Sequence, residues 1–359
     1  MPTPASLTNS PKVSDWLDFT RDGYVAIKTG KVEFGQGILT ALLQIVAEEL
    51  NVPLEKCYPV AASTALSPNE GFTAGSLSVQ DSGSALRLAS AIARVRAGSE
   101  SYWVIAATLG WDIPIDVNVI VKRPEEYSLV GRSTQRIDLD SKVQGKPSYI
   151  HDLRFENLLF ARVLRPPADS QVVHERGVVG PGDLSSKASY SRPYLSHGSI
   201  GTVTAVAQWV DDFLHVWSQT QGVYPLRADI ARAFGLDIDH ITVTHMEGAG
   251  CYGHNGADDV AFDAALVARH VSGKPILLSW SREDELSWAP FGPAMRWRHL
   301  SDPRGRDVIT KVAEISGWGQ ELPDGCGKGI GFARYKNKGA WCAVVAQVEA
   351  ETHVKVTNL

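Results

Sequence analysis

The chain has 359 residues, of which 44% are apolar and 21% charged, and its formal charge is -5 at pH 7. This length allows one large hydrophobic core or two to three smaller ones. The charges form no basic stripe, so nothing in the sequence attracts nucleic acid or an anionic membrane surface. We therefore expect an ordinary globular protein with neither of these partners.

The sequence shows neither a membrane span nor a secretion signal. No apolar run reaches the roughly 18 residues that a span needs, and the opening MPTPASLTNSPK lacks the apolar stretch of a signal peptide. We therefore expect a cytoplasmic protein. The four cysteines contain no CxxC pair, which favours buried free thiols over a disulfide framework or a zinc knuckle; they are Cys57, Cys251, Cys326 and Cys342.

The first third of the chain predicts a strand followed by a helix. Residues 23–34 (GYVAIKTGKVEF) alternate apolar and polar side chains, which predicts a strand pair or a bent strand. An apolar stripe then runs from Ile38 to Leu50 and predicts a helix that ends before Pro53. A second, alanine-rich helix is expected over 85–97, after a loop rich in Ser, Gly and Thr.

The middle of the chain changes character. Short alternating segments bounded by Gly and Pro fill residues 127–167, which predicts a small strand-rich module. Residues 168–190 are rich in Ser, Gly and Asp and are typical of a linker.

The second half predicts alternating strands and helices, so we expect a protein of the α+β class. Strands are expected over 202–210, 214–220, 241–246, 275–280 and 343–349, and helices over 225–234, 258–270 and 302–315.

One glycine-rich stretch fits the GxGxxG pattern of dinucleotide-binding proteins. It follows the predicted strand ITVTHM and precedes a predicted helix. Against a nicotinamide or flavin site, the helix begins late and Asp258 and Asp259 occupy its first turn, where they would repel a pyrophosphate. The stretch consists of Gly248, Ala249, Gly250, Cys251, Tyr252 and Gly253.

A second candidate, Gly35-Gln36-Gly37, lies at the turn between the first predicted strand and helix. Glycines let a ligand approach the backbone, and helix-terminal amides together with a Gln side chain can donate hydrogen bonds to an anion. The alternative is a tight turn that carries an exposed glutamine.

Side chains that could hold a metal or start a reaction form no known pattern. The spacings of His240, His245, Cys251 and His254 match no recurrent zinc site. The sequence contains no GxSxG, and no SxxK placed before a helix. We therefore assign no catalytic residue and no metal ligand.

Longer strings resemble the molybdopterin-binding large subunits of the xanthine dehydrogenase and aldehyde oxidase family, in the branch of nicotinate dehydrogenase and isoquinoline 1-oxidoreductase. The strings cover most of the chain. They are GKVEFGQGILTALLQIVAEEL (30–50), SPNEGFTAGSLSVQDSG (67–83), SRPYLSHGSIGTVTAVAQW (191–209), WSQTQGVYPLRADIARAFGL (217–236), EGAGCYGHNGADDVAFDAALVARHVSGKP (247–275), SREDELSWAPFGPAM (281–295) and GIGFARYKNKGAWCAVVAQVE (329–349).

The resemblance implies the family's molybdopterin-binding fold with an α/β hammerhead module, in an incomplete form. Residues 1–126 would form an N-terminal molybdopterin-binding segment, 127–167 the hammerhead-like module, 168–190 a linker and 191–359 the second molybdopterin-binding domain. It also implies that Gly35, Gln36 and Gly37, together with the loop Gly248 to Gly253, hold the cofactor.

The implied activity is oxidative hydroxylation of an N-heteroaromatic, nicotinate-like compound or an aldehyde, with water as the oxygen source. The implied cofactor is molybdenum–molybdopterin in its cytosine dinucleotide form. Electrons would pass to a small iron–sulfur protein partner, because this chain has no cysteine set able to ligate a cluster. A cytochrome c or a second large-subunit fragment are further candidate partners.

The sequence also departs from the family pattern. Family members are considerably longer, their catalytic glutamate lies in a Gly-Glu-Pro stretch without a counterpart before Leu359, and a core segment is missing near 295–296. Two alternatives follow: a non-catalytic, truncated homologue or assembly component, and an NAD-dependent oxidoreductase that uses GAGCYG.

Overall fold

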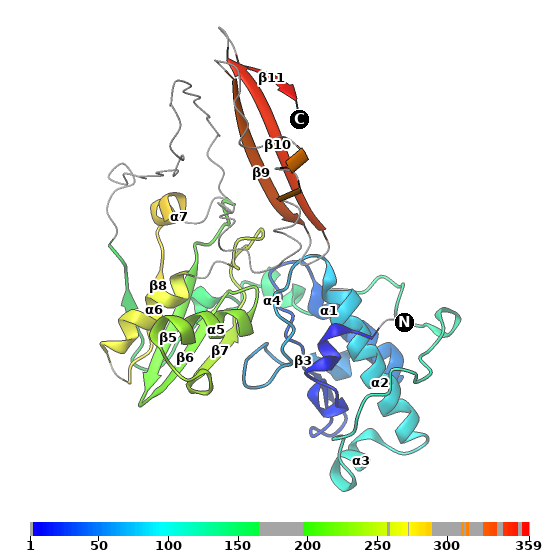
Figure 1. Ribbon diagram of the computed structural model, residues 1–359. Coiled ribbons are helices and arrows are strands. Elements are labelled where there is room, and N and C mark those ends of the chain that lie inside the picture. The colour runs from blue at the N-terminus through cyan, green and yellow to red at the C-terminus, as the bar shows by residue number, and fades with distance from the viewer. Residues whose placement is uncertain are drawn as a thin grey trace. The chain divides into compact units, whose positions relative to one another are not determined.

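The computed structural model describes residues 3–164, 197–256, 259–271, 273–288, 310–311, 314–315, 326–335, 340–350 and 354–358. The chain divides into two compact units, of which the first comprises Met1–Arg165 and His197–Ala289 and the second Pro166–Ser196 and Pro290–Leu359. Helices and strands are mixed along the chain (Figure 1), which confirms the predicted class of fold. The expected linker 168–190 and the junction near 295–296 lie outside the described residues.

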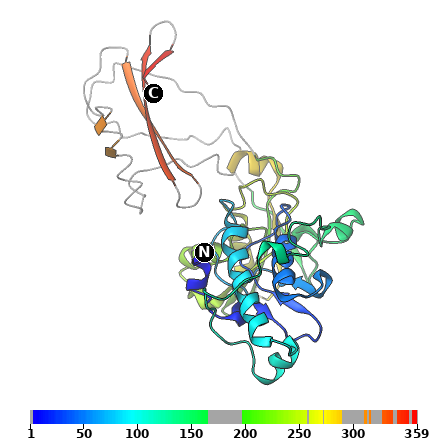
Figure 2. The ribbon, with the colours of Figure 1, turned by 90° about the vertical axis from the view of Figure 1, so that its right-hand side faces the viewer.

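The N-terminal part of the first unit packs helices against a small sheet of order β1-β2-β3. Strand β2 pairs antiparallel with β1 and parallel with β3, and α1 forms the connection from β2 to β3. The blue-to-cyan helices stay together when the view is turned by 90° (Figure 2). The elements are β1 (Leu17–Asp18), β2 (Val25–Ile27), α1 (Ile38–Leu50), β3 (Cys57–Pro59), α2 (Ser84–Ala97) and α3 (Tyr102–Thr108).

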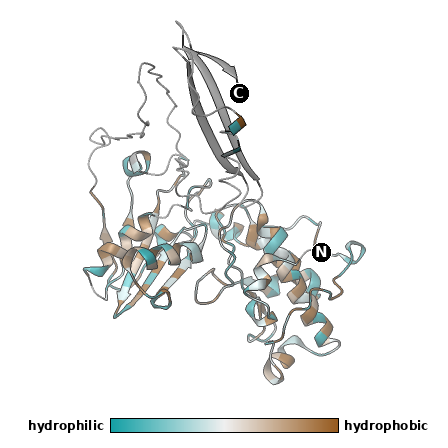
Figure 3. Ribbon diagram, in the orientation of Figure 1, coloured by the Kyte–Doolittle hydropathy of each residue, from teal (hydrophilic) through white to brown (hydrophobic). Residues whose placement is uncertain are grey.

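Helix α1 has the bounds that its apolar stripe predicts. Leu42, Leu43 and Val46 are fully buried in the core of this part. Asn51 ends the helix in the left-handed conformation, with φ of 58°. Figure 3 shows helices that carry both apolar and polar residues, as expected of amphipathic helices on a shared core.

Of the strand pair or bent strand predicted over 23–34, the structure forms a strand only in the first half. Only β2 forms, and residues after it do not fold back on it. The amides of Gly30 and Val32 instead donate to the side chains of Glu70 and Thr73, which lie in the Ser- and Gly-rich loop before α2. A long-range side-chain contact therefore replaces a local strand pairing.

Residues 197–288, together with the strand at 159–161, build a second core around a five-stranded sheet of order β4-β8-β5-β6-β7. Neighbours β5–β6 and β5–β8 are antiparallel, whereas β6–β7 and β4–β8 are parallel. Apolar residues of α5 and α6 pack into this core. The elements are β4 (Leu159–Ala161), β5 (Thr204–Val210), β6 (Phe213–Ser218), α5 (Val223–Phe234), β7 (Ile241–His245), α6 (Asp259–Arg269), β8 (Ile276–Ser279) and α7 (Arg282–Trp288).

The segment expected to be a strand-rich module contains little strand. Between 127 and 164 the structure has the short helix α4 (Leu139–Val143) and one strand, β4, which joins the five-stranded sheet. Glycines and prolines between short apolar segments also fit an extended, irregular path. The hammerhead assignment and the domain boundaries remain predictions.

The second unit contains an antiparallel sheet of order β11-β10-β9. Strand β10 contains the predicted strand 343–349, and its pairing with β11 shifts register between Gln347 and Val348. Most of the predicted helix 302–315 lies outside the described residues. The strands are β9 (Cys326–Tyr335), β10 (Ala340–Ala350) and β11 (Val354–Asn358).

Shorter helical turns complete the described structure. Residues Ser78–Gly83 form a π-helical turn that runs into α2. The 3₁₀ turns are Ala5–Thr8, Val13–Asp15, Leu54–Lys56, Pro124–Glu126, Ile150–Asp152 and Ile238–His240.

Candidate functional site

The turn that carries Gln36 is held by the carboxylate of Glu33. Its Oε1 accepts hydrogen bonds from the backbone amides of Gly35 at 2.9 Å and Gly37 at 2.8 Å, and Oε2 accepts from the amide of Leu39 at 3.3 Å. These amides belong to the N-terminus of α1, which sequence reasoning offered to an anion. In this structure the chain's own carboxylate accepts from them, and the assignment of Gly35, Gln36 and Gly37 to the cofactor stays a prediction.

The Gln36 side chain is bonded within its own loop. Its Oε1 accepts from the Phe34 amide at 2.8 Å, and its Nε2 donates to the Val32 carbonyl at 2.9 Å. Arg136 adds a third restraint by donating from Nη1 to the Gly35 carbonyl at 2.7 Å. For Gln36 to contact a ligand, its amide must exchange these internal hydrogen bonds for new ones.

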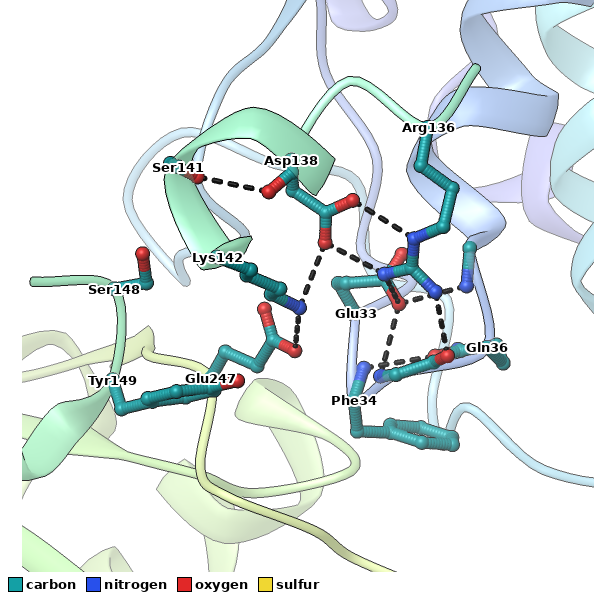
Figure 4. Close-up of polar contacts among 12 residues, drawn as sticks. Glu33, Phe34, Gln36, Arg136, Asp138, Ser141, Lys142, Ser148, Tyr149 and Glu247 are labelled. Atoms are coloured by element: carbon teal, nitrogen blue, oxygen red, sulfur yellow. Dashed lines mark hydrogen bonds and ion pairs between the residues drawn. The ribbon is translucent and has the colours of Figure 1, made fainter. Parts of the chain in front are cut away.

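A chain of alternating charges connects this turn to the glycine loop (Figure 4). Arg136 lies 3.4 Å from Glu33 and 2.6 Å from Asp138, and Lys142 lies 2.7 Å from Asp138 and 2.5 Å from Glu247. The hydrogen bond from Arg136 holds the pKa of Asp138 well below its usual range, whereas burial raises the pKa of Glu247 despite Lys142.

The carboxylates of these charged side chains border a cavity of about 400 Å³. Carboxylate oxygens of Glu33, Asp138 and Glu247 lie within 4.8 Å of one another, and among the described residues they form the one group that could hold a metal ion. Arg136 and Lys142 offset two of their three negative charges. A cavity bordered by these carboxylates does not suit the phosphate of an anionic cofactor.

His245 joins the Gln36 turn to the strand that leads into the glycine loop. Its Nε2 lies 2.8 Å from the Glu33 carbonyl oxygen and its Nδ1 lies 2.9 Å from the Thr220 carbonyl oxygen. Burial lowers the pKa of His245 to about 4. The structure thus brings together two segments that are more than 200 residues apart, and both carry residues predicted for the site.

The loop Gly248 to Gly253 has a backbone that needs its glycines. Gly250 and Gly253 have φ of 108° and 98°, and Tyr252 also has a positive φ of 53°. A Cβ on Gly248 would overlap the side-chain amide of Gln219. Because α6 begins only at Asp259, the loop amides do not form its N-terminus, unlike the arrangement in a dinucleotide-binding fingerprint.

Three buried amide side chains surround this loop and have hydrogen-bonding atoms without a partner among the described residues. Gln219 has neither amide atom bonded, and Gln221 and Asn255 each leave the oxygen unbonded. Their nitrogens donate to the carbonyls of Thr73 and Gln219, respectively, which fixes the orientation of both amides. Buried acceptors in folded proteins usually accept a hydrogen bond, which an ordered water or a bound ligand can supply to these atoms.

Sequence reasoning did not single out these amides. Gln219 and Gln221 lie just after β6, and Asn255 lies just before α6. The sequence gives one indication of these amides. Two glutamines stand two positions apart directly after a strand with buried residues.

Glu70 is a further buried carboxylate next to the site. Its Oε2 accepts from the Thr29 hydroxyl at 2.7 Å, the Gly30 amide at 2.8 Å and the Ser82 hydroxyl at 3.1 Å, while Oε1 has no partner among the described residues. Burial raises the pKa of Glu70. Lys31 nearby donates to the carbonyl oxygen of Glu70 at 2.7 Å. These contacts fix the loop before α2.

The histidines and cysteine considered for zinc serve other contacts. Cys251 is buried and its Sγ accepts from the Gly253 amide at 3.4 Å, and the His254 ring nitrogen Nδ1 lies 2.9 Å from the Cys251 carbonyl oxygen. His245 uses both ring nitrogens on backbone carbonyls. Of this group, His245 also borders the carboxylate-lined cavity.

Comparison with protein families identifies two matching regions. Residues 3–102 and residues 183–299 each match a model described as a molybdopterin cofactor-binding domain. The first region contains the Gln36 turn and the second contains the glycine loop. Among the described residues, no helix combines the length and apolar character needed to cross a membrane.

Individual proteins are similar to parts of the chain. One of the subunits of nicotinate dehydrogenase from Pseudomonas putida is 31% identical over 76% of this chain, which spans 32% of that protein. Aldehyde oxidase 4 of Rattus norvegicus is 40% identical over 18% of the chain and 5% of its own length. The solved quinoline 2-oxidoreductase of Pseudomonas putida 86 aligns with a TM-score of 0.23 at 23% identity, covering 24% of this chain and 12% of that one.

The two matching regions together span more than half of the chain and contain both predicted loops. The chain belongs to the xanthine dehydrogenase and aldehyde oxidase family of molybdopterin-binding proteins. It covers about a third of the length of its nicotinate dehydrogenase relative. This assignment accounts for the glycine loop without a nicotinamide cofactor.

Proposed function

We propose that this chain is a molybdopterin-binding part of a molybdenum hydroxylase. The carrying observation is the cluster of buried amides with unbonded oxygens near the glycine loop, in a chain whose two matching regions are both of the molybdopterin-binding type. Pterin rings carry N–H groups that can donate to such oxygens. The relative named for nicotinate supports an N-heteroaromatic substrate, and the aldehyde oxidases support an aldehyde.

The residues near the glycine loop fit the cofactor better than those around Glu33. Gln219 and Asn255 offer neutral amides, and Gly248, Gly250 and Gly253 leave the backbone open to close approach. We assign cofactor contacts to this side of the site. We also assign cofactor contacts to the rest of the loop, which is Ala249, Cys251 and Tyr252, and to the other turn, which is Gly35, Gln36 and Gly37.

Gln36 would contribute after a local rearrangement. Its amide must leave Val32 and Phe34, and Arg136 and Glu33 would keep the surrounding turn in place while it does so. The carboxylates of Glu33, Asp138 and Glu247 would direct the anionic part of the cofactor away from their cavity.

The bound cofactor supplies two-electron oxidation of an electron-poor carbon, with water as the source of oxygen. The part of this chain is to hold and orient the cofactor through amides and backbone groups. We extend the proposal to a cytosine dinucleotide form of the cofactor and to an iron–sulfur partner protein. The four separated cysteines of this chain support the second point, because they do not match a cluster-binding pattern.

Metal and pterin analysis tests this proposal. The chain would be purified from a host that makes molybdopterin, alone and together with a candidate iron–sulfur partner. We expect molybdenum and pterin near one equivalent, with a several-fold loss in Gln219→Ala and Gln36→Ala. Gln208→Ala is the matched control, because Gln208 lies on β5 and donates to Gly273, outside both loops.

The outcomes separate the candidate functions. Loss of molybdenum in both loop variants but not in Gln208→Ala supports the cofactor site and justifies assays with N-heteroaromatic compounds and aldehydes. Absence of molybdenum and pterin from every preparation refutes the proposal and favours a non-catalytic homologue. Equal molybdenum in all variants refutes the residue assignment.

A further inference from the structure

The glycine loop packs against residues 197–203, the supporting segment, which lead into β5. The Gly201 amide donates to the Ala249 carbonyl at 2.8 Å. A Cβ on Gly201 would lie 2.9 Å from the Ala249 Cβ, so the segment and the loop meet without room for a further side chain. The stacked rings of His197 and His254 add a second contact, with their centroids 5.0 Å apart. The position of the loop therefore depends on where the supporting segment lies.

Helix α7 holds the supporting segment through one arginine. Arg282 Nη2 donates to the carbonyls of Ser199 at 2.5 Å and of Ile200 at 3.0 Å. A guanidinium group carries several N–H donors in a fixed planar arrangement, so a single side chain can bond two successive carbonyls. These carbonyls directly precede Gly201, whose amide bonds the loop.

The same helix holds the segment a second time through Glu285. Its Oε1 accepts from the Val203 amide at 2.7 Å, and its Oε2 accepts from Arg282 Nη1 at 2.6 Å. Glu285 is only 3% exposed, and a carboxylate at such a depth depends on its hydrogen bonds and on its cation. Together the two side chains bond the backbone of the segment on both sides of Gly201.

We propose that Arg282 and Glu285 are positioning residues for the glycine loop, which they hold through the supporting segment in the conformation that meets the cofactor. The inference rests on the proposed function, because the ligand of the loop is the proposed cofactor. Both side chains bond the segment and each other, so their effect reaches the loop through the Gly201 amide. Without Arg282 the loop should open more often.

Thiol alkylation measures opening of the loop without any cofactor. Cys251 lies in the loop and is fully buried, whereas Cys57 is buried in the core of the N-terminal part. Iodoacetamide labelling of the full-length, cofactor-free chain, followed by mass spectrometry, gives a separate rate for each cysteine. We expect Arg282→Ala to raise the rate at Cys251 roughly tenfold, because charge-assisted hydrogen bonds that hold the closed loop are lost. The rate at Cys57 should not change.

Three further variants separate positioning from general loss of stability. Arg282→Lys keeps the charge but not the planar set of donors, so its rate at Cys251 should lie between those of Arg282→Ala and the parent. Gly201→Ala pushes the segment against the loop and should also raise this rate. Val216→Ala is the matched control in the same core, on β6. It should lower the midpoint of thermal unfolding without the rise at Cys251.

Pterin retention connects the position of the loop with the cofactor. The parent, Arg282→Ala and Val216→Ala would be purified from a host that makes molybdopterin and assayed for pterin before and after dialysis. We expect Arg282→Ala to keep several-fold less pterin than Val216→Ala. Circular dichroism would confirm that each variant is folded.

The two measurements decide different claims. Faster labelling at Cys251 but not at Cys57 in Arg282→Ala, together with weaker pterin retention, supports the proposal. Labelling equal to that of the parent, or an equal rise in Val216→Ala, overturns it whatever the cofactor content. Faster labelling with unchanged pterin retention overturns the connection with the cofactor. Faster labelling with no pterin in any preparation supports the hold on the loop and refutes the proposed cofactor function instead.

Discussion

The Glu33 carboxylate accepts a hydrogen bond at 2.8 Å from the amide of Gly37, four residues later and directly before α1, and so caps this helix. Gly37 has φ of 77°, which suits glycine, and the Cβ of another residue would lie 3.6 Å from Arg136. The cap therefore depends on the Glu33 side chain, on the positive φ of Gly37 and on Arg136, which lies far away in the sequence. It stabilises the turn that carries Gln36.

Removal of this cap should destabilise the protein. We expect Glu33→Ala to lower the free energy of unfolding by about 1–2 kcal/mol, because it leaves helix-terminal amides unsatisfied. Glu33→Gln keeps one acceptor and should have a smaller effect. Urea denaturation measures both, and Glu125→Ala, at an exposed position, is the control. Equal stabilities of Glu33→Ala and the control would contradict the capping role.

The stability of the protein should depend on pH through the ionisation of Glu48. Burial alone would raise its pKa, but the amides of Leu129, Val130 and Ser128 and the ammonium of Lys122 lower it from 4.5 to about 2. A carboxyl group with a lowered folded-state pKa stabilises the protein above its unfolded pKa, and this stabilisation is lost as the pH falls towards the folded value.

Glu48→Gln should therefore lower the free energy of unfolding by on the order of 2 kcal/mol at pH 7. The variant should also show a flatter stability curve than the parent between pH 4.5 and 2, the range set by the two pKa values. Chemical denaturation at a series of pH values measures both effects, with Glu125→Gln as the control. Parallel curves for Glu48→Gln and the parent would exclude this role.

The sequence predicts those parts of the fold that have a local cause. The apolar stripe of α1 gives its limits at Ile38 and Leu50, and the alternating segments of 202–220 give β5 and β6. The strand pair expected over 23–34 fails because its amides bond to Glu70 and Thr73, about 40 residues away. The periodicity of apolar residues along the sequence carries no information on such long-range contacts.

The candidate site also combines features with a local cause, which the sequence predicts, and features that depend on long-range contacts. Glycines at 35, 37, 250 and 253 have positive φ, which their sequence context indicates. The charge chain is invisible in the sequence, since Arg136 and Lys142 lie more than 100 residues from Glu33 and Glu247, respectively. Resemblance to a family found the loops, but only the folded structure shows that Glu33 already occupies the amides assigned to an anion.

The ion pair between Lys142 and Glu247 should be energetically coupled. Lys142→Met removes a cation that pairs with two carboxylates. It should therefore lower the free energy of unfolding more in the parent protein than in the Glu247→Gln variant. A double-mutant cycle by urea denaturation should give a coupling energy of about 1 kcal/mol. The exposed pair Arg232 and Asp229 is the matched control and should give a value near zero. Similar coupling in both cycles would argue against a special role for the half-buried pair of Lys142 and Glu247.

The contact between Gly248 and Gln219 predicts a suppressor. A Cβ at position 248 would overlap the Gln219 amide, which is 1% exposed, so Gly248→Ala should lower the free energy of unfolding by roughly 1–3 kcal/mol, as overpacking does in a filled core. The Gln219 amide has no hydrogen-bond partner among the described residues, so its truncation breaks no bond that this structure contains. Gln219→Ala should therefore restore part of the stability lost in Gly248→Ala, which thermal unfolding of the two single variants and the double variant would measure. If the two losses simply add, the amide does not lie against Gly248 in solution, and the assignment of Gln219 to the cofactor side of the loop loses its structural basis.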